Sequence, residues 1–266
     1  MAEIVREAGI NTASCHALLK ALTMSGYLLK LPKEGRYVMG PALVAAGQAA
    51  MKIHPLIDRA QQAAQELFDE LGVPVMLATM AGDDILALSS HADRSGRTVG
   101  MKTGQRLPVV PSACLVFVAW SSEATIEKWL ARAGVKDETD LDLWRQALAL
   151  IRERGFQVTL LVTKEHPLSE LMAEMARGHK IPEYKNKSLG LIGSSEQNLE
   201  QLAQIIPDEH YDVAMIAAPI FDEYETAPLS MVLGGFAEKL TGAEIEKLAE
   251  QLVRTCLRVM REHRSV

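Results

Sequence analysis

The first forty residues constrain the fold most, because several short elements must follow one another there with almost no connecting chain. Residues 2–8 predict a short helix that Gly9 ends. Asn11 or Thr12 can cap a second helix, which Gly26 stops. Four apolar residues recur at helical spacing along this second helix and define its expected buried face: Cys15, Leu18, Leu19 and Leu22.

A β-hairpin is predicted directly after the second helix. Residues 27–31 and 36–39 have the pattern of strands, and residues 32–35 that of a turn. Helix, tight turn, helix and hairpin form the layout of a winged helix-turn-helix, whose second helix enters the DNA major groove. The same spacing also fits a helical hairpin followed by a β-hairpin in another small domain, and spacing alone does not decide between them.

Composition restricts the class of protein. The chain has 266 residues, of which 48% are hydrophobic and 23% charged, which is typical of a folded globular protein. No apolar run approaches the roughly 20 residues of a membrane helix, and no signal segment opens the chain. We therefore expect a cytoplasmic protein without membrane contact. Three distant cysteines predict neither a disulfide framework nor a CxxC metal site.

Charge is distributed unevenly along the chain. Residues 1–50 hold five Lys or Arg and three Asp or Glu, a net charge of +2, whereas the whole chain carries −6. A basic N-terminal segment, residues 1–50, followed by an acidic remainder favours a nucleic-acid-binding domain attached to a second domain of another function.

The remaining residues predict a linker helix and a mixed α+β domain. Apolar residues form a continuous helical stripe from Pro55 to Leu71. Thr241 and Glu244 form a capping box at the start of a long final helix. Between these helices we expect an antiparallel sheet flanked by helices, with strands at 73–81, 85–90, 98–101, 211–221 and 227–236 and helices at 111–120, 122–133 and 140–154.

Several short motifs, in series, resemble the IclR-type bacterial transcription regulators. The N-terminal stretch carries "AGI" before the second helix, "LLKAL" within it, and "GYL" and "GRYVMGPAL" around the hairpin. Further matches are "GQRLP" at 104–108, "IRERGF" at 151–156, which in the family precedes a central strand, and "AAPIFDE" at 217–223. The resemblance covers nearly the whole chain, in the family's order.

This resemblance implies a fold and a function. It implies a winged helix-turn-helix DNA-binding domain at 1–50, a linker helix at 51–72 and a GAF/PAS-like effector-binding domain at 73–266. Members are repressors or activators that bind palindromic operators as dimers or tetramers and respond to small carboxylates or aromatic catabolites. No cofactor is implied. The alternative is a ligand-binding sensor with a vestigial winged domain that acts through protein partners.

The head departs from the family in two ways. The family has a helix before the one at residues 2–8, so we expect either a start further upstream or a winged domain truncated at its start. The family also commonly has a Lys early in the recognition helix and an Arg before the Leu-Leu pair, where this chain has Thr12 and Ala17. The predicted DNA-binding residues, with an AT-leaning site or weak binding expected, are Thr12, Ala13, Ser14, His16, Lys20, Lys33 and Arg36.

The body departs from the family in length. An insertion is predicted at about 162–206, with helices at 168–176 and 197–206. It would be a surface decoration, a lid over the effector pocket or an added oligomer contact.

In the family, the effector lies between the sheet and the helix that follows Gly-x-x-Leu-Pro. The helix start predicts an anion site, and the late strands bring apolar residues, so the resemblance implies a partly apolar or aromatic carboxylic acid. The same residues would otherwise simply form core. The predicted effector-binding residues are Ser112, Ala113, Cys114, Met215, Val232 and Gly234.

Catalysis is not expected. Cys114 has no base fixed near it in the sequence, and a buried cysteine is commonly a small apolar residue. Asp83, Asp84, His91 and Asp93 match no metal-binding motif. The sequence therefore predicts neither catalytic nor metal-binding residues.

Overall fold

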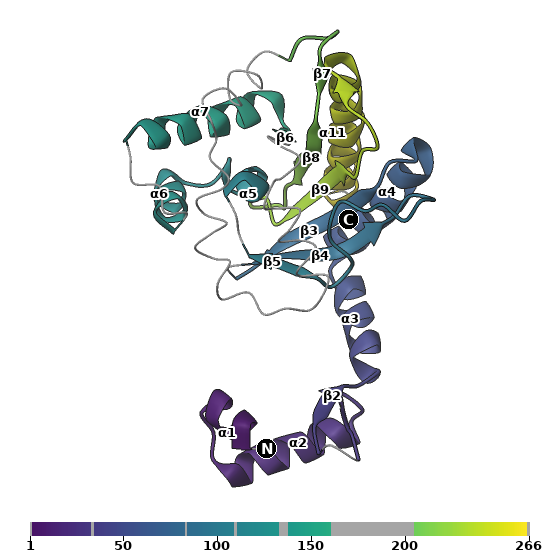
Figure 1. The fold of residues 1–266 in the computed structure, drawn as a ribbon, viewed down its shortest axis with the longest axis vertical. Coiled ribbons are helices and arrows are strands. Elements are labelled where there is room, and N and C mark those ends of the chain that lie inside the picture. Colours follow the sequence, from purple (N-terminus) through teal and green to yellow (C-terminus); the bar gives the residue numbers. More distant parts are fainter. Residues whose placement is uncertain are drawn as a thin grey trace. The chain divides into compact units, whose positions relative to one another are not determined.

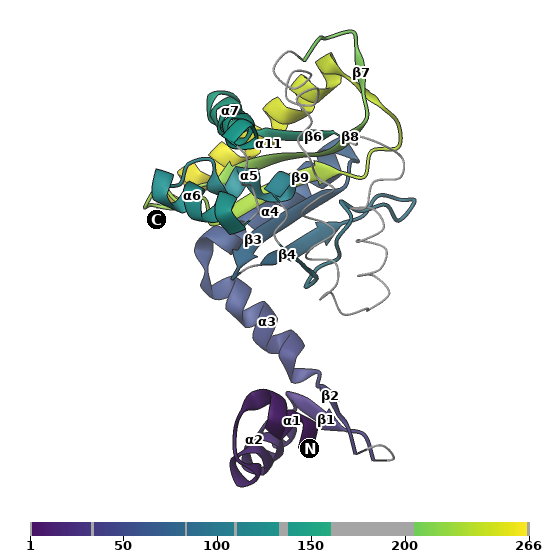
Figure 2. The same ribbon diagram turned by 60° about the vertical axis from the view of Figure 1, so that its left-hand side comes forward.

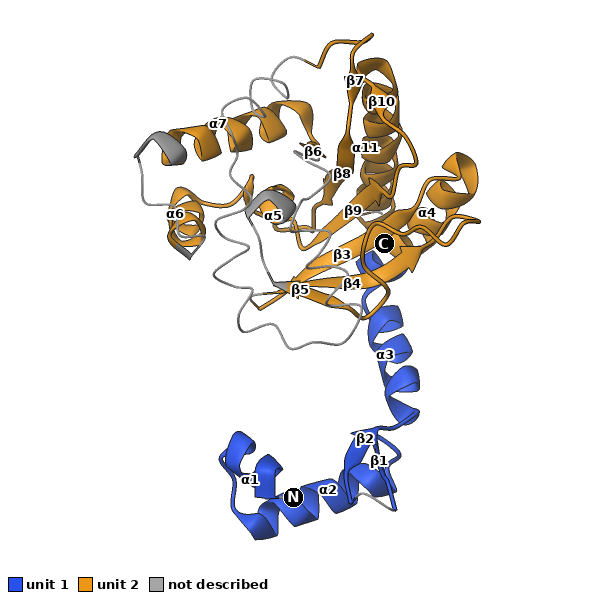
Figure 3. Ribbon diagram, in the orientation of Figure 1, with its two compact units in different colours: residues 1–58 blue, residues 59–266 orange. Residues whose placement is uncertain are grey.

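A computed structural model describes residues 2–32, 35–82, 84–108, 111–132, 138–160 and 205–264 of the chain. The chain divides into two compact units, residues 1–58 and 59–266 (Figure 3). Both mix helices with antiparallel strands, as the α+β prediction required. Among the described residues, no helix is both long and apolar enough to cross a bilayer.

The first unit contains the predicted helices with their predicted starts. Helix α1 spans Ala2–Ala8 and α2 spans Thr12–Met24. Asn11 caps α2, because its side-chain oxygen accepts a 2.8 Å hydrogen bond from the Ser14 backbone N–H. Such a cap is worth about 1 kcal/mol of helix stability.

A hairpin and a third helix complete this unit. Strands β1 (Leu28–Lys30) and β2 (Tyr37–Met39) pair antiparallel, and α3 (Ala42–Ile53) follows. The base of the hairpin is held by a close approach of two glycines, because a Cβ atom on Gly40 would lie 2.0 Å from the Gly26 carbonyl oxygen. This close approach explains why the second glycine of "GRYVMGPAL", Gly40, cannot be a larger residue.

The apolar face predicted for α2 is only half buried. Cys15 and Leu19 are 1% and 6% exposed, but Leu18 and Leu22 are 53% and 39% exposed. Helix α1 has seven residues and is therefore only about 10 Å long, so it covers a limited part of its neighbour. The prediction that all four residues share one buried face is wrong for Leu18 and Leu22.

Within its described residues, the second unit contains a six-stranded antiparallel sheet with the strand order β5-β4-β3-β9-β8-β6 (Figures 1 and 2). The strands are β3 (Val75–Ala81), β4 (Asp84–His91), β5 (Arg106–Pro108), β6 (Gln157–Leu160), β8 (Val213–Ile220) and β9 (Leu229–Gly234). Two further short strands, β7 (His210–Tyr211) and β10 (Leu240–Thr241), pair with each other.

Two strand predictions are wrong. Residues 98–101 form no strand, because the Gly100 N–H donates to the Thr98 side-chain oxygen at 3.1 Å, a local bond that competes with strand pairing. The strand after "IRERGF", β6, lies at the end of the described strand order rather than at its centre.

Helices cover both faces of the sheet. Helices α4 (Pro55–Leu71) and α11 (Gly242–Arg264) lie on one face, and α5 (Pro111–Val118), α6 (Glu123–Arg132) and α7 (Glu138–Arg154) lie on the other (Figures 1 and 2). The predicted capping box opens α11: the Thr241 N–H donates to the Glu244 carboxylate at 2.7 Å, and the Glu244 N–H donates to the Thr241 hydroxyl at 3.2 Å. The predicted insertion at about 162–206 falls almost entirely outside the described residues.

Alternation along the strands assigns their side chains to these two layers. Met231 and Leu233 of β9 are fully buried, and they alternate with Val232, which belongs to the apolar cluster beneath α5, α6 and α7. Ala217 on β8 is opposite Val232 and joins the same cluster. The sheet therefore has two separate apolar layers, and the cluster beneath α5 is the one that contains predicted effector residues.

Candidate functional site

The N-terminal half of α2 presents one exposed surface. Cys15 and Leu19 face the interior, whereas the other residues of the first two turns are exposed. The Asn11 cap satisfies the Ser14 N–H and fixes the first turn. The predicted DNA-binding residues of this helix are all exposed: Thr12, Ala13, Ser14, His16 and Lys20.

The hairpin, which directly follows this helix in the sequence, contributes further basic residues. Arg36 precedes β2 and is exposed. Lys30 on β1 is opposite Tyr37, and its ammonium nitrogen lies 5.9 Å from the centre of the Tyr37 ring. A cation over an aromatic ring is held by the ring's negative face. Lys33 lies outside the described residues.

Three predicted effector residues meet at one apolar cluster of the second unit. Cys114 in the first turns of α5 and Val232 on β9 belong to the buried apolar cluster beneath α5, α6 and α7, and the half-buried Met215 on β8 packs against it. Met215 pairs in register with Gly234, which is buried. The backbone of Ser112 and Ala113 belongs to the first turn of α5, and their side chains lie outside the described set.

Packing requires a glycine at position 234. A Cβ atom there would lie 2.9 Å from both Val99 Cγ1 and the Ala214 carbonyl oxygen. The backbone of β9 therefore approaches the 92–103 segment more closely than any side chain would allow. This close approach brings Val99 over the cluster side of the sheet, where it is 8% exposed.

The Cys114 thiol is unsuited to nucleophilic chemistry. It is 1% exposed, and burial raises its pKa to about 12, an effect that the neighbouring Trp129 side chain opposes to a smaller extent. A thiol with so high a pKa holds almost no thiolate at neutral pH. Cys114 therefore serves as a small apolar wall of the cluster.

Two polar residues reach this cluster that sequence reasoning missed. Gln157 on β6 is 1% exposed; its side-chain oxygen accepts the Val116 N–H of α5 at 2.9 Å, and its amide donates to the Thr159 hydroxyl at 3.0 Å. Trp129 on α6 is 8% exposed, and its side chain is a hydrogen-bond partner of the buried Cys114 thiol. The position of Gln157 directly after "GF", at the start of a predicted strand, could have marked it as a polar residue of the sheet. Trp129 has no such signal, because it fits the apolar pattern of its helix.

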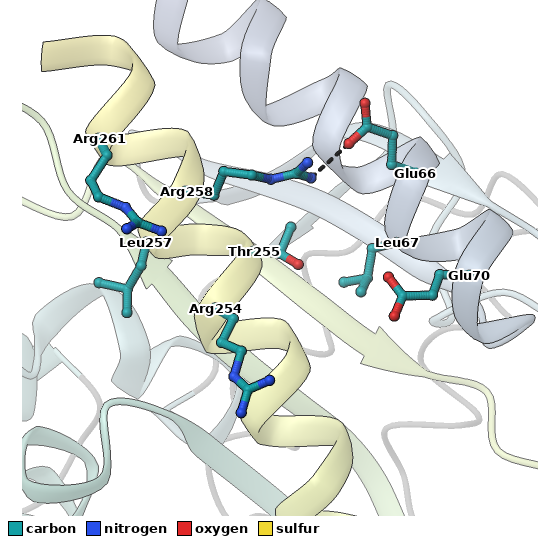
Figure 4. A pocket seen from close by; sticks show the side chains of 8 residues that line it. All are labelled: Glu66, Leu67, Glu70, Arg254, Thr255, Leu257, Arg258 and Arg261. Atoms are coloured by element: carbon teal, nitrogen blue, oxygen red, sulfur yellow. Dashed lines mark hydrogen bonds and ion pairs between the residues drawn. The ribbon is translucent and has the colours of Figure 1, made fainter. Parts of the chain in front are cut away.

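A separate groove of about 530 Å³ lies between α4 and α11 (Figure 4). Arg258 crosses it to bind the Glu66 carboxylate at 2.6 Å, and Arg254 binds Glu250 at 2.5 Å. Because these two arginines are already paired with acids, the groove is a poor anion site. Neither the sequence motifs nor the resemblance pointed to this groove.

No metal centre is found among the described residues, where no three His, Cys, Asp or Glu side chains gather closely enough to hold an ion. Asp93, one of the residues weighed for such a role, instead accepts hydrogen bonds from Ser95 and Arg97. These bonds hold the pKa of its carboxyl well below the usual range, with the Ser95 hydroxyl as the largest cause. Asp83 lies outside the described residues.

Solved structures share this arrangement of helices and sheet. An IclR transcriptional regulator from Alicyclobacillus acidocaldarius superimposes with a TM-score of 0.67 over 98% of this chain and 89% of that chain, at 17% identity. The chain has the fold of the IclR-type transcription regulators. An IclR homologue from Microbacterium hydrocarbonoxydans in complex with 4-hydroxybenzoate superimposes with a TM-score of 0.63 over 100% and 91% of the two chains, at 16% identity.

Comparison of the amino-acid sequence also finds transcription regulators. The HTH-type transcriptional regulator XynR of Escherichia coli K12 is 26% identical over 160 residues, which are 58% of this chain and 64% of that protein. The match thus spans less than two thirds of the relative's length. No family model matches the chain. These similar proteins bear the names of transcription regulators rather than of enzymes.

Proposed function

We propose that this chain is a DNA-binding transcription regulator of the IclR type, whose operator binding is controlled by a small carboxylic acid. The observation that carries the proposal is the exposed N-terminal half of α2, capped by Asn11 and followed directly by a hairpin. This is the geometry that a recognition helix and its wing require. The similarity to solved and named transcription regulators supports it.

On the DNA side, we propose that the head at 1–50 reads a palindromic operator as a dimer or tetramer in the cytoplasm. Thr12, Ala13, Ser14 and His16 would contact base edges, and Lys20 a phosphate. Threonine and alanine methyl groups fit the thymine methyl group, so an operator that leans towards A·T pairs is expected. Lys33 and Arg36 would contact phosphates beside the hairpin.

On the effector side, we propose that residues 73–266 bind a partly apolar or aromatic acid, with the linker at 51–72 between the two domains. The first turn of α5 offers backbone N–H groups without helical partners, which favour an anion. The residues around it are apolar: Cys114 and Val232 are buried, and Met215 is half-buried against them. The solved neighbour that holds 4-hydroxybenzoate makes that acid the first probe.

Selection from randomised duplex DNA tests the DNA-binding part. The selected duplex should bind with an affinity that falls steeply between 50 and 200 mM salt, because phosphate contacts release counterions. Lys20→Ala should weaken binding to all sequences and reduce the salt slope by about one. Lys52→Ala, an exposed lysine at the end of α3, is the matched control and should leave binding unchanged.

The alternative function, a sensor that acts through protein partners, predicts a different result. Selection would then enrich no palindrome, and Lys20→Ala and Lys52→Ala would be indistinguishable. That outcome would refute the regulator proposal even if the second unit binds an acid.

A further inference from the structure

The first unit keeps little of its apolar surface away from water. Among the described parts of residues 1–58, the buried apolar side chains are Cys15, Leu19 and Leu56, whereas ten large apolar side chains are exposed. The described residues of the second unit, which is more than three times as long, expose only three. Exposed apolar surface that concentrates in one part of a protein marks a contact site.

Helix α3 shows this exposure most clearly. It spans Ala42–Ile53, and none of its side chains is buried within the described structure. Its two end residues are large and exposed, Leu43 to 40% and Ile53 to 75%. A helix that is apolar on most sides is normally buried in a protein, so α3 has the composition of a covered helix without the cover.

Two polar side chains mark the outer edge of α3. Gln48 and Lys52 are four residues apart, so they are neighbours on one side of the helix. The opposite side carries four apolar residues with the spacing of a coiled-coil seam: Leu43, Ala46, Ala50 and Ile53. With this spacing, one helix packs along a second helix.

A second copy of α3 complements this face. The helix carries one charged side chain, Lys52, and this residue lies on the outer edge, so packing two copies together buries no charge. The face has large residues at both ends and alanines in the middle. Whether the two helices run parallel or antiparallel, large side chains therefore meet large ones and alanines meet alanines. A face that complements itself is what a two-fold dimer requires.

The exposed apolar surface is large enough for a dimer. At roughly 100 Å² for a fully exposed side chain of this size, the ten exposed residues of the first unit leave on the order of 1,000 Å² in two copies. Specific protein interfaces begin near about 1,000 Å² in total. The area therefore fits a second copy of the same unit.

We propose that α3 is the dimer contact of the first unit, in which Leu43, Ala46, Ala50 and Ile53 pack against the same face of α3 in a second copy. This inference rests on the proposed regulator function, because a palindromic operator needs two winged domains held at a fixed separation. It adds the partner, which is a second copy of this chain, and the helix face that holds it.

The test compares Ala50→Glu with Gln48→Glu in the full chain, by sedimentation over a dilution series. Glutamate is a good helix former, so both variants keep α3 and add the same charge. Ala50→Glu places that charge in the contact without a partner and should weaken self-association roughly 30-fold or more. Gln48→Glu places it on the outer edge and should change self-association less than about 3-fold. Far-UV circular dichroism checks that both variants stay folded.

Chemical cross-linking gives a second readout in the native assembly. In Ala50→Cys, a bis-maleimide with a spacer of about 10 Å, one helix diameter, should join two chains covalently. In Gln48→Cys, the two thiols would lie on opposite outer edges of the helix pair and should remain unjoined. The native Cys15, Cys114 and Cys256 are all buried and should react slowly with the reagent.

Every other result overturns the inference. A wild type that stays monomeric at tens of micromolar would do so, and so would an Ala50→Glu variant that associates like the wild type, because α3 would then be covered by another part of its own chain or left bare. Equal weakening by Ala50→Glu and Gln48→Glu would make added charge the cause, and not the helix face. Selection from randomised duplex DNA tests the regulator function separately, so failure of this inference is distinguishable from failure of that function.

Discussion

The close approach of Gly26 and Gly40 makes the hairpin unusually sensitive to one methyl group. In Gly40→Ala, the added Cβ would lie 2.0 Å from the Gly26 carbonyl oxygen, a distance that no real carbon atom can adopt. The backbone must separate, and two hydrogen bonds that fix the hairpin base are then lost: Gly40 N–H to Tyr27 O at 2.8 Å and Ala42 N–H to Gly26 O at 3.2 Å. At about 1 kcal/mol each, the first unit should lose at least about 2 kcal/mol of unfolding free energy.

The chain offers a matched control in the same unit. Gly47 lies within α3, and a Cβ there would meet no atom within 4 Å. Gly47→Ala should therefore be neutral or should stabilise the unit by up to about 1 kcal/mol, because alanine is the better helix former. The two variants differ by the same methyl group and are expected to change stability in opposite directions.

Hydrogen exchange followed by mass spectrometry measures both variants in the full chain. In Gly40→Ala, peptides that cover β1, β2 and the start of α3 should exchange faster, while peptides from the six-stranded sheet should be unchanged. DNA binding, if the proposed function is right, should weaken in parallel. Unchanged exchange in the hairpin of Gly40→Ala would refute the reasoning, as would equal acceleration in Gly47→Ala.

Three further predictions concern titration, capping and thiol access. Burial lowers the pKa of His91, and the nearby Asp69 carboxylate offsets this only in part, so on acidification the unfolded chain binds a proton at His91 before the folded chain does. The free energy of unfolding should therefore fall as the pH drops below about 6.5, and denaturant titrations of His91→Phe should show a smaller dependence on pH. Thr241→Ala should cost about 1 kcal/mol in thermal unfolding, because it breaks the capping box of α11. Native Cys114 and Cys256, both with pKa raised to about 12 by burial, should resist a disulfide reagent at pH 8 and react only on unfolding; fast native labelling would contradict this.

Local signals predicted most of the helices. The cap at Asn11 and the box at Thr241 are side-chain to backbone contacts within three residues, so the sequence contains both partners. The stripe from Pro55 to Leu71 likewise repeats with the helical period. Helix α3 was not predicted because residues 42–53 are nearly all small or apolar, with polar side chains only at Gln48 and Lys52, so no apolar stripe stands out. None of its side chains is buried within the described structure.

Non-local pairing was harder to predict. Strand β5 has three residues and exists only because Leu107 pairs with Ile85 of β4, a partner that no local pattern reveals. The placement of β6 beside β8 at the end of the strand order has the same origin, since pairing between distant segments decides it. The alternating apolar pattern predicted that strands exist, but not their order.

The candidate effector region shows why residue type can hide a role. Cys114, Met215 and Val232 were predicted from the family's helix and strand positions, and the fold brings Cys114 and Val232 into one buried cluster with Met215 packed against it. Trp129 contributes to the helical stripe of α6 like any apolar residue, so pattern reading counts its ring and ignores its N–H. Only the packed structure shows that the Trp129 side chain lies against the Cys114 thiol of α5, to which it is a hydrogen-bond partner.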